Sequence, residues 1–438
     1  MKKVIVLILI TFLECPSMFG QSAENSLSTI QKTYILSRFC TEVKYNFVYY
    51  DKIKLDWDSL CVANIPLLTQ TSTDNDFMNG LKHLCAQLHD GHTYIFSQNN
   101  PKNTDDWIRP LPMKTKRIGD RVFVTGVYNS SLRDQGLCAG CEVLEIDGEK
   151  VLDYARNHIQ PYIASSTPQW TEYVPFKEYE LTQDKGSKVS NILFRNAKGK
   201  TFSISSNRNV KWDLPKDSLA LDYKVVGKNI GLLTIRSFQR GEFTTAMFDK
   251  IFKELSGTSG LIIDVRDNGG GNSGFADYVI SHFSSKPIPR GNWRSPMYIA
   301  AHASWHYAPE WYMQPGEPID PAENVKIYNK PVVLLVNAGT FSSAENFCVA
   351  FKGARRGKII GSKTAGSTGN PISIDLGFGV GCRICTRQEW DADGNEFVGK
   401  GITPDVEVAE SPDIFLKNKD NLIEAAMKDI SWATKCLQ

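Results

Sequence analysis

The sequence has almost no net charge, and it contains only one long apolar run. Its 438 residues include 50 Lys and Arg against 48 Asp and Glu, which leaves a net charge of +2. A chain this balanced carries no extended field, which argues against a nucleic-acid-binding protein or one held on an anionic membrane. The one long apolar run, residues 4–13, is too short to span a bilayer. We therefore expect no nucleic-acid partner and no stable membrane insertion.

The apolar run fits an export signal. A basic pair precedes it and small residues follow within 20–23, which is the pattern of a secretory signal peptide. We expect residues 1–20 to be removed and the mature protein to be exported, to the periplasm or outside the cell. Cys15 raises the alternative of a lipoprotein, but Glu14 stands where such a processing site has a small residue.

Ten cysteines are too few to form the disulfide framework of a small secreted domain in a chain this long. Two pairs have the C-x-x-C spacing, Cys138 with Cys141 and Cys382 with Cys385. Together they could form a zinc site. However, the second pair falls in a strand-like run, where residues three apart face opposite sides, and the pairs belong to different predicted domains. We expect no metal, and an isolated structural disulfide stays open.

Hydrophobic periodicity divides the chain into three regions and a tail. Residues 24–100 have helical spacing, and residues 108–210 alternate mostly as strands do. Residues 220–410 alternate strand and helix, an order that predicts an α/β layer. Residues 411–438 are expected to form a terminal helix. The predicted fold class is therefore a multidomain α/β protein.

A glycine-rich turn follows an apolar, strand-like run at 260–265. It reads Arg266-Asp267-Asn268-Gly269-Gly270-Gly271. Glycines let a backbone turn tightly and present its amides to an anion. The turn is not a P-loop, because no Gly-Lys-Ser/Thr follows, and it lacks the dinucleotide spacing G-x-G-x-x-G. It is either a plain turn or an anion or oxyanion site, and no cofactor is expected.

A serine-rich turn follows the next apolar run, at 331–336. A serine between a strand and a helix projects its hydroxyl at the positive end of the helix, which suits a nucleophile. Ser342 and Ser343 both occupy this position in Phe341-Ser342-Ser343-Ala344-Glu345. The alternative is that one of them only caps the helix.

Histidines supply the remaining candidates. His92 ends a helical pattern in an Asp-Gly-His-Thr step, where a histidine by itself is usually structural. His302 and His306 are four apart, but no carboxylate accompanies them as in the metal-binding pattern H-E-x-x-H. We expect the aromatic segment 293–312 around them to pack as a lid over a pocket.

Taken in chain order, these segments resemble one family: the tail-specific (C-terminal processing) proteases, the tricorn core protease and the interphotoreceptor retinoid-binding modules. The resemblance covers roughly residues 30–410. It implies an N-terminal helical domain, a PDZ-like domain over 108–210 and a crotonase-like catalytic domain over 220–410. The segments that carry it are residues 90–93, 136–148, 264–271, 341–345, 361–369 and 401–406.

The resemblance implies a serine peptidase with Ser342 as its nucleophile. The backbone amides of Ser343 and Gly270 would then form the oxyanion hole. Two such donors aimed at a developing oxyanion lower the barrier by a few kcal/mol.

Members of this family differ in the residue that serves as the general base. Tail-specific proteases use a lysine in a Gly-Lys step, which reads Gly366-Ser367 here, so Lys363 is the nearest alternative. The tricorn core protease uses a histidine of its N-terminal domain, oriented by a serine beside it, and a glutamate near the C-terminal end. His92 matches that histidine, but Gly91 stands in place of the serine. Glu396 is expected to be the glutamate.

We therefore expect an exported serine peptidase acting on peptides or unfolded proteins. His92 serves as the base near neutral pH without an extreme pKa shift, and the PDZ-like domain captures peptides by strand addition. One alternative is a non-catalytic binder of an apolar ligand or peptide on the same fold. The other is a peptidase with a Ser342–Lys363 dyad.

Overall fold

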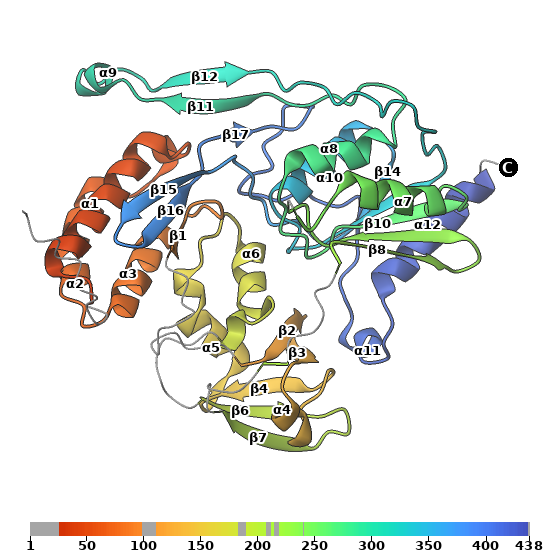
Figure 1. Ribbon diagram of the computed structural model, residues 1–438, viewed down its shortest axis with the longest axis horizontal. Helices are drawn as coiled ribbons and strands as arrows, with labels where there is room; N and C mark the ends of the chain where they lie inside the picture. The colour runs from red at the N-terminus through yellow and green to blue at the C-terminus, as the bar shows by residue number, and fades with distance from the viewer. Residues whose placement is uncertain are drawn as a thin grey trace, which may run out of the picture.

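The computed structural model describes residues 26–98, 111–182, 190–206, 212–213, 219–239 and 241–436. The expected signal peptide, residues 1–20, lies outside them. Figure 1 shows three bodies: N-terminal helices with a small sheet, a second sheet below, and a larger α/β body beside both. The multidomain α/β fold class expected from the sequence is confirmed.

The α/β body is a parallel sheet with helices on both faces. Its strands follow the order β18-β14-β13-β10-β9-β8, and only β8 runs antiparallel to its neighbour. The elements are β8 (Leu221–Val226), β9 (Ile230–Ile235), α7 (Thr245–Leu255), β10 (Gly260–Asp264), α8 (Ser273–Ser281), β13 (Val332–Val336), α10 (Ser343–Gly353), β14 (Gly357–Gly361), β18 (Val406–Glu407), α11 (Pro412–Phe415) and α12 (Asn421–Cys436).

Every residue of β10 and β13 is buried, which explains why these strands read as unbroken apolar runs. Side chains alternate between two cores. Leu261 and Ile263 pack with α7, α8 and α10, whereas Ile262 packs with α12. The carboxyl ends of β10 and β13 lie side by side, so the turns that follow them meet at one edge of the sheet.

The second sheet is antiparallel, with the order β2-β3-β4-β6-β7. Asp147 and Gly148, both with positive φ, turn the chain from β4 into β5 as the Asp-Gly step predicts. Its elements are β2 (Met113–Ile118), β3 (Arg121–Val127), α4 (Ser130–Asp134), β4 (Glu142–Ile146), β5 (Glu149–Lys150), α5 (Val151–His158), β6 (Ser190–Arg195) and β7 (Thr201–Ser206).

A segment of short helices separates α5 from β6. It contains η2 (Gln160–Tyr162), α6 (Pro168–Tyr173), η3 (Val174–Phe176) and η4 (Glu180–Thr182). In Figure 1, α6 lies centrally, between the second sheet and the two other bodies.

The N-terminal helices share a core with a distant part of the chain. β1 pairs with β16, which pairs with β15, and Phe39 and Phe77 lie in one cluster with Leu376 and Val380. The helical region therefore does not end at residue 100 as a separate domain. The elements are α1 (Thr29–Asn46), η1 (Tyr50–Lys52), α2 (Trp57–Thr69), α3 (Asp74–Ala86), β1 (Tyr94–Ser97), β15 (Ile372–Gly377) and β16 (Val380–Ile384).

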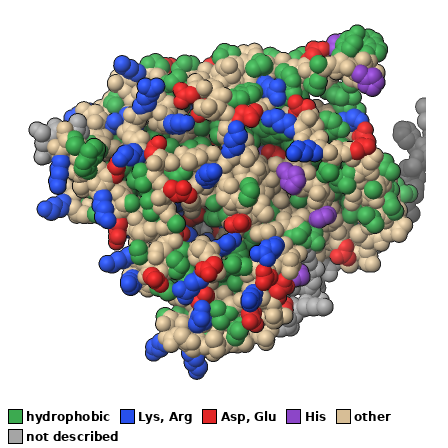
Figure 2. Space-filling view, turned by 180° about the vertical axis from the view of Figure 1, so that it is seen from behind, with side chains coloured by type: hydrophobic (Ala, Val, Ile, Leu, Met, Phe, Trp, Pro, Cys, Tyr) green, Lys and Arg blue, Asp and Glu red, His purple; other side chains and the backbone are tan. Residues whose placement is uncertain are grey.

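The aromatic segment forms an arm rather than a lid. β11 (Trp293–Met297), α9 (Ala300–Ser304) and β12 (Glu310–Gln314) form a hairpin, and β17 (Gln388–Glu389) pairs with its base. Figure 1 shows the arm extending over the other elements, and Figure 2 shows apolar and His side chains gathered at its tip. Trp305 is 60% exposed and Tyr307 61%, so the expected packed lid is wrong.

The cysteines also separate by body. A disulfide joins Cys40 of α1 to Cys61 of α2. Cys141 lies in the core of the second sheet, whereas Cys382 and Cys385 lie in that of the N-terminal helices, so the two C-x-x-C pairs form no common site. Among the described helices, none has the length and apolar character needed to cross a bilayer.

Candidate active site

Ser342 occupies a strained turn between β13 and α10. Its φ is 58° and its ψ is −126°, a backbone conformation that residues other than glycine rarely adopt. Although Ser342 is the N-cap residue of α10, its side chain makes no capping hydrogen bond. Its Oγ lies 2.9 Å from His92 Nε2 instead. The geometry therefore favours a nucleophile over a cap.

His92 comes from the loop before β1, 250 residues before Ser342 in the sequence. Its side chain is buried, and its ring stacks on Phe341, with 4.4 Å between centroids and 11° between planes. Burial, helped by the positive charge of Arg383, lowers the pKa of His92 to about 3. The expectation of a histidine without an extreme shift is thus wrong. The imidazole is therefore neutral across the physiological range, and one ring nitrogen keeps a free lone pair.

Ser367 is the partner on the other ring nitrogen of His92. Its Oγ lies 2.7 Å from His92 Nδ1, and its carbonyl accepts a hydrogen bond from Ser342 N at 3.0 Å. If Nε2 is to accept the proton of Ser342, Nδ1 must carry the ring proton and donate it to Ser367 Oγ. The Ser367 hydroxyl can accept that bond, so the contact is compatible with the tautomer in which His92 Nε2 faces Ser342 as an acceptor.

Glu345, one turn into α10, holds the Ser367 loop. Its carboxylate accepts hydrogen bonds from Gly366 N and Ser367 N, each at 2.7 Å, and from the Thr364 hydroxyl. The side chain is fully buried, and that burial raises its pKa to about 7 despite these donors. Glu345 thus connects α10, the helix that follows Ser342, to the loop whose Ser367 hydroxyl contacts His92.

Asp90 supports the His92 loop in a similar way. It accepts hydrogen bonds from His92 N at 3.1 Å and from the Thr93 hydroxyl at 2.7 Å. Burial raises the pKa of Asp90 to about 6, opposed by these hydrogen bonds. A second buried carboxylate, that of Asp90, therefore holds the backbone of the loop that carries His92.

The glycine turn lies against Ser342. A Cβ added to Gly270 would come within 2.7 Å of Ser342 Cβ and 2.8 Å of Ser343 N, so only glycine leaves the space in front of that amide open. The Gly270 amide, however, already donates to Asn268 Oδ1 at 2.8 Å. The Gly271 amide has no partner among the described residues, and its carbonyl accepts from the Ser343 hydroxyl at 2.8 Å. The amides of Ser343 and Gly271 therefore lie near Ser342 with no hydrogen-bond acceptor among the described residues.

Two expected residues lie elsewhere. Glu396 hydrogen-bonds to Gln388 and forms an ion pair with Lys52 at 3.3 Å, so its carboxylate is engaged outside the cluster of Ser342, His92 and Ser367. Lys363 is exposed, and the Ser342 hydroxyl is directed at the histidine. The expected role of Glu396 is corrected, and the geometry gives no support to a Ser342–Lys363 dyad.

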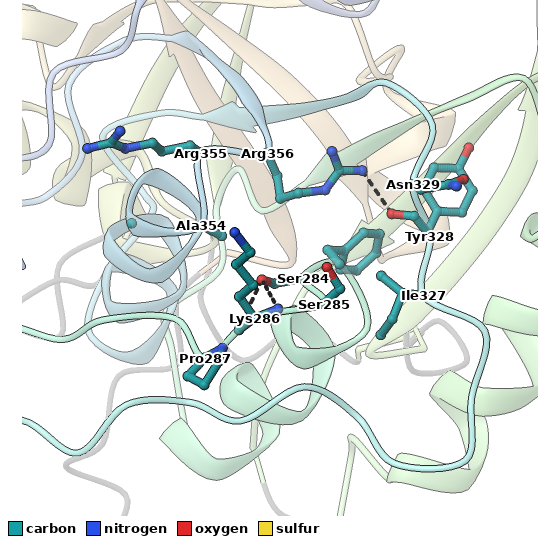
Figure 3. A pocket seen from close by; sticks show the side chains of 12 residues that line it. Ser284, Ser285, Lys286, Pro287, Ile327, Tyr328, Asn329, Ala354, Arg355 and Arg356 are labelled. Atoms are coloured by element: carbon teal, nitrogen blue, oxygen red, sulfur yellow. Dashed lines mark hydrogen bonds between the residues drawn. The ribbon is translucent and has the colours of Figure 1, made fainter.

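Two cavities lie outside this cluster. A cleft of about 850 Å³ runs between β2 and the end of β10, and Lys177 and Gly269 both line it. Figure 3 shows a smaller pocket of about 340 Å³, in which Arg356 donates to the Tyr328 carbonyl at 2.8 Å. The smaller pocket contains none of the candidate catalytic residues. The larger cleft is lined in part by Asp267 and Gly269 of the glycine turn.

Two residues of this cluster, Ser367 and Glu345, were not among the site residues expected from the sequence. The step Gly366-Ser367 was interpreted only as a missing lysine, although a hydroxyl at that position was the available signal. Glu345 carried a signal in its spacing from Ser342, because residues three apart share a helix face.

Comparison with known proteins finds similarity to one family over part of the chain. Residues 229–408 match the model of Peptidase family S41. The chloroplastic C-terminal processing peptidase of Tetradesmus obliquus is 30% identical over 183 residues, 41% of this chain and 35% of that protein. The carboxy-terminal processing protease CtpB of Bacillus subtilis (strain 168) is 25% identical over 316 residues, 72% of this chain and 57% of that protein. The chain thus covers less than two thirds of these relatives' length.

Solved structures agree at the level of the fold. Mature CPAF superposes with a TM-score of 0.68 at 15% identity, covering 92% of this chain and 96% of that one. The resemblance inferred from the order of the motifs is confirmed by the family match and these relatives.

Proposed function

We propose, on the premise that residues 229–408 are an S41 peptidase region, that the chain hydrolyses peptide bonds through an acyl-enzyme on Ser342. The observation that supports this most directly is the 2.9 Å separation between Ser342 Oγ and His92 Nε2, with His92 neutral. A neutral base in contact with a strained serine is the arrangement that nucleophilic acyl transfer needs.

The reaction begins when a peptide carbonyl reaches Ser342. His92 Nε2 removes the hydroxyl proton as Oγ attacks, and the imidazolium is stabilised through Nδ1–H and Ser367 Oγ. His92 then gives the proton to the leaving amine, which leaves the acyl group on Ser342. Water, deprotonated by the same nitrogen, hydrolyses the ester and restores the serine.

The oxyanion of the tetrahedral intermediate takes its donors from two elements. Ser343 N is the first amide of α10 and has no partner within the helix, and the positive end of the helix dipole adds to its effect. The Gly270–Gly271 turn supplies the second donor. Because the Gly270 amide also serves Asn268, we assign the larger part to Gly271.

We also propose domain assignments for the two larger sheets and export of the protein. The second sheet is assigned as PDZ-like, from its Gly136–Gly148 stretch, and the α/β body as crotonase-like. The pattern of residues 1–20 supports export, and peptides or unfolded proteins are the substrates that fit. Strand addition at β2 is not part of the proposal, because Thr115 N of that strand donates to Glu178 O at 3.1 Å.

The test compares the wild-type protein with Ser342→Ala and His92→Ala. Hydrolysis of an unfolded protein and a peptide library is measured, together with labelling by a serine-directed fluorophosphonate. Wild type is expected to hydrolyse and become labelled, whereas both folded variants lose at least about a thousandfold in rate. A wild-type protein that neither hydrolyses any substrate nor takes the label would sink the peptidase and favour a binder.

A further inference from the structure

One segment, residues 165–182, is fixed to the second sheet at its C-terminal end. Thr115, on the outer strand β2, donates its amide to Glu178 O at 3.1 Å and its hydroxyl to Phe176 O at 3.3 Å. Phe176 and Leu181 are buried in the core of that sheet. The segment therefore occupies the strand edge at which an added peptide would pair.

The N-terminal end of the segment contacts the loop that carries the base. Gly91 N donates to Ser166 Oγ at 2.9 Å, and Ser166 Oγ lies 3.4 Å from Asp90 Oδ1. Both contacts fall within two residues of His92. Ser166 thus fixes the backbone that presents the imidazole.

Thr167 holds the loop of Ser367 in two ways. Its hydroxyl donates to Ala365 O at 2.6 Å, and a Cβ on Gly366 would come within 2.5 Å of its methyl group. Gln169 Nε2 adds a hydrogen bond to Thr364 O at 2.9 Å. Thr167 is only 4% exposed, so these contacts are shielded from water.

The middle of the segment touches the two remaining turns. Trp170 stacks on Phe341, with 4.6 Å between centroids and 22° between planes, directly before Ser342. Tyr173 donates its hydroxyl to Asp267 Oδ1 at 3.0 Å, at the start of the glycine turn. One short stretch of chain therefore contacts all four loops that form the site.

We propose that residues 165–182 are a positioning element that fixes the relative placement of Ser342, His92 and Ser367, with Thr167 as its principal positioning residue. The inference rests on the peptidase function proposed above. The four loops come from distant parts of the chain, and this segment is a common support for them. Since small displacements of reacting groups cost large factors in rate, loosening the support lowers the rate of acylation.

The experiment uses two matched substitutions in the full chain. Thr167→Val keeps the branched shape but removes two hydrogen bonds, the one to Ala365 O and the N-cap bond that Thr167 Oγ accepts from Trp170 N of α6. Thr171→Val makes the same change in α6, where the hydroxyl bonds only within the segment, to Ser165 Oγ and Thr167 O. Thr167→Ser keeps the hydroxyl and serves as the conservative variant. Fluorophosphonate labelling rate, kcat, KM and Tm are measured for each.

The expected result is a split between catalysis and folding. Thr167→Val lowers kcat and the labelling rate by about tenfold or more with little change in KM, whereas Thr171→Val stays within about threefold of wild type at a similar Tm. Thr167→Ser recovers most of the lost rate.

Two outcomes overturn the inference. In one, Thr167→Val lowers Tm but leaves kcat and the labelling rate unchanged, which assigns Thr167 a purely structural role. In the other, Thr167→Val and Thr171→Val lower kcat equally. An active wild type with an inactive Ser342→Ala variant keeps both results separate from a failure of the peptidase itself.

Discussion

His92 Nδ1 lies 2.7 Å from Ser367 Oγ, and this contact depends on a glycine at position 91. A Cβ on Gly91 would lie 2.9 Å from Ser367 Oγ and 3.1 Å from the Phe341 ring. The sequence suggested that a serine was missing next to the histidine. The structure places a serine hydroxyl there from another loop, and the glycine provides the room for it.

Ser367→Ala should lower kcat by about ten- to a hundredfold with little change in KM. The substitution removes the acceptor for Nδ1–H, so the imidazole loses its preferred tautomer and orientation. Steady-state kinetics on a peptide substrate checks this. Gly91→Ala, which displaces the same hydroxyl by contact, should give a similar loss, and full activity in both variants would contradict the role of Ser367.

Lys363→Ala should leave kcat/KM within about twofold of wild type. The lysine is exposed and lies outside the cluster of Ser342 and His92. Surface substitutions away from special contacts usually change the free energy of unfolding by less than about 0.5 kcal/mol, so we expect the variant to fold normally. A loss of activity with normal folding would replace His92 by a lysine base.

Ser342→Gly should stabilise the protein while abolishing hydrolysis. The φ of 58° at Ser342 is strained for any residue with a Cβ, and glycine relieves on the order of 1 kcal/mol of that strain. Ser342→Ala removes the same hydroxyl but keeps the strain, so it is the control. Denaturant titrations of the two variants are compared, and because glycine alone costs about 0.5–1 kcal/mol of unfolded-chain entropy against alanine, a Ser342→Gly variant less stable than Ser342→Ala by that amount would show that the turn stores no strain.

Glu345 should give the activity an acidic limb near pH 7. As an ionised carboxylate it accepts three hydrogen bonds from the Ser367 loop, and burial raises its pKa to about 7. Protonation below that pH weakens the contacts and lowers kcat. Glu345→Gln should remove the limb at a reduced kcat. If Asp90→Asn removes it instead, the limb belongs to Asp90, whose pKa is about 6.

The same titration should appear in stability with the opposite slope. The folded pKa of Glu345 is raised from 4.5, so the folded state binds more protons and its contribution is full below about pH 4.5. That contribution is lost as the pH rises through about 7, by on the order of 3 kcal/mol. Unfolding of wild type and Glu345→Gln by urea across this window measures the difference. A difference that stays constant with pH would contradict the shift.

The local sequence pattern was enough to predict the strands and the helix around the site. β10 and β13 were predicted as buried strands because their residues are apolar without interruption, and the helix beginning at Ser343 was predicted from the turn before it. The order of short motifs also indicated the family, since each motif keeps its own local geometry. The sequence by itself thus determined the strand-to-helix turn of Ser342 and the glycine turn beside it.

Only the tertiary structure decided which side chains surround His92. Ser367 lies 275 residues away in sequence, and nothing local distinguishes its hydroxyl from any other. Glu396 was expected in the catalytic set from its position in the chain, but its carboxylate binds Gln388 and Lys52 instead. The pKa of His92 was likewise out of reach, because it depends on how completely the folded chain excludes water from the imidazole. Pairing and burial are properties of the packed molecule, whereas turns and strands are encoded by neighbouring residues.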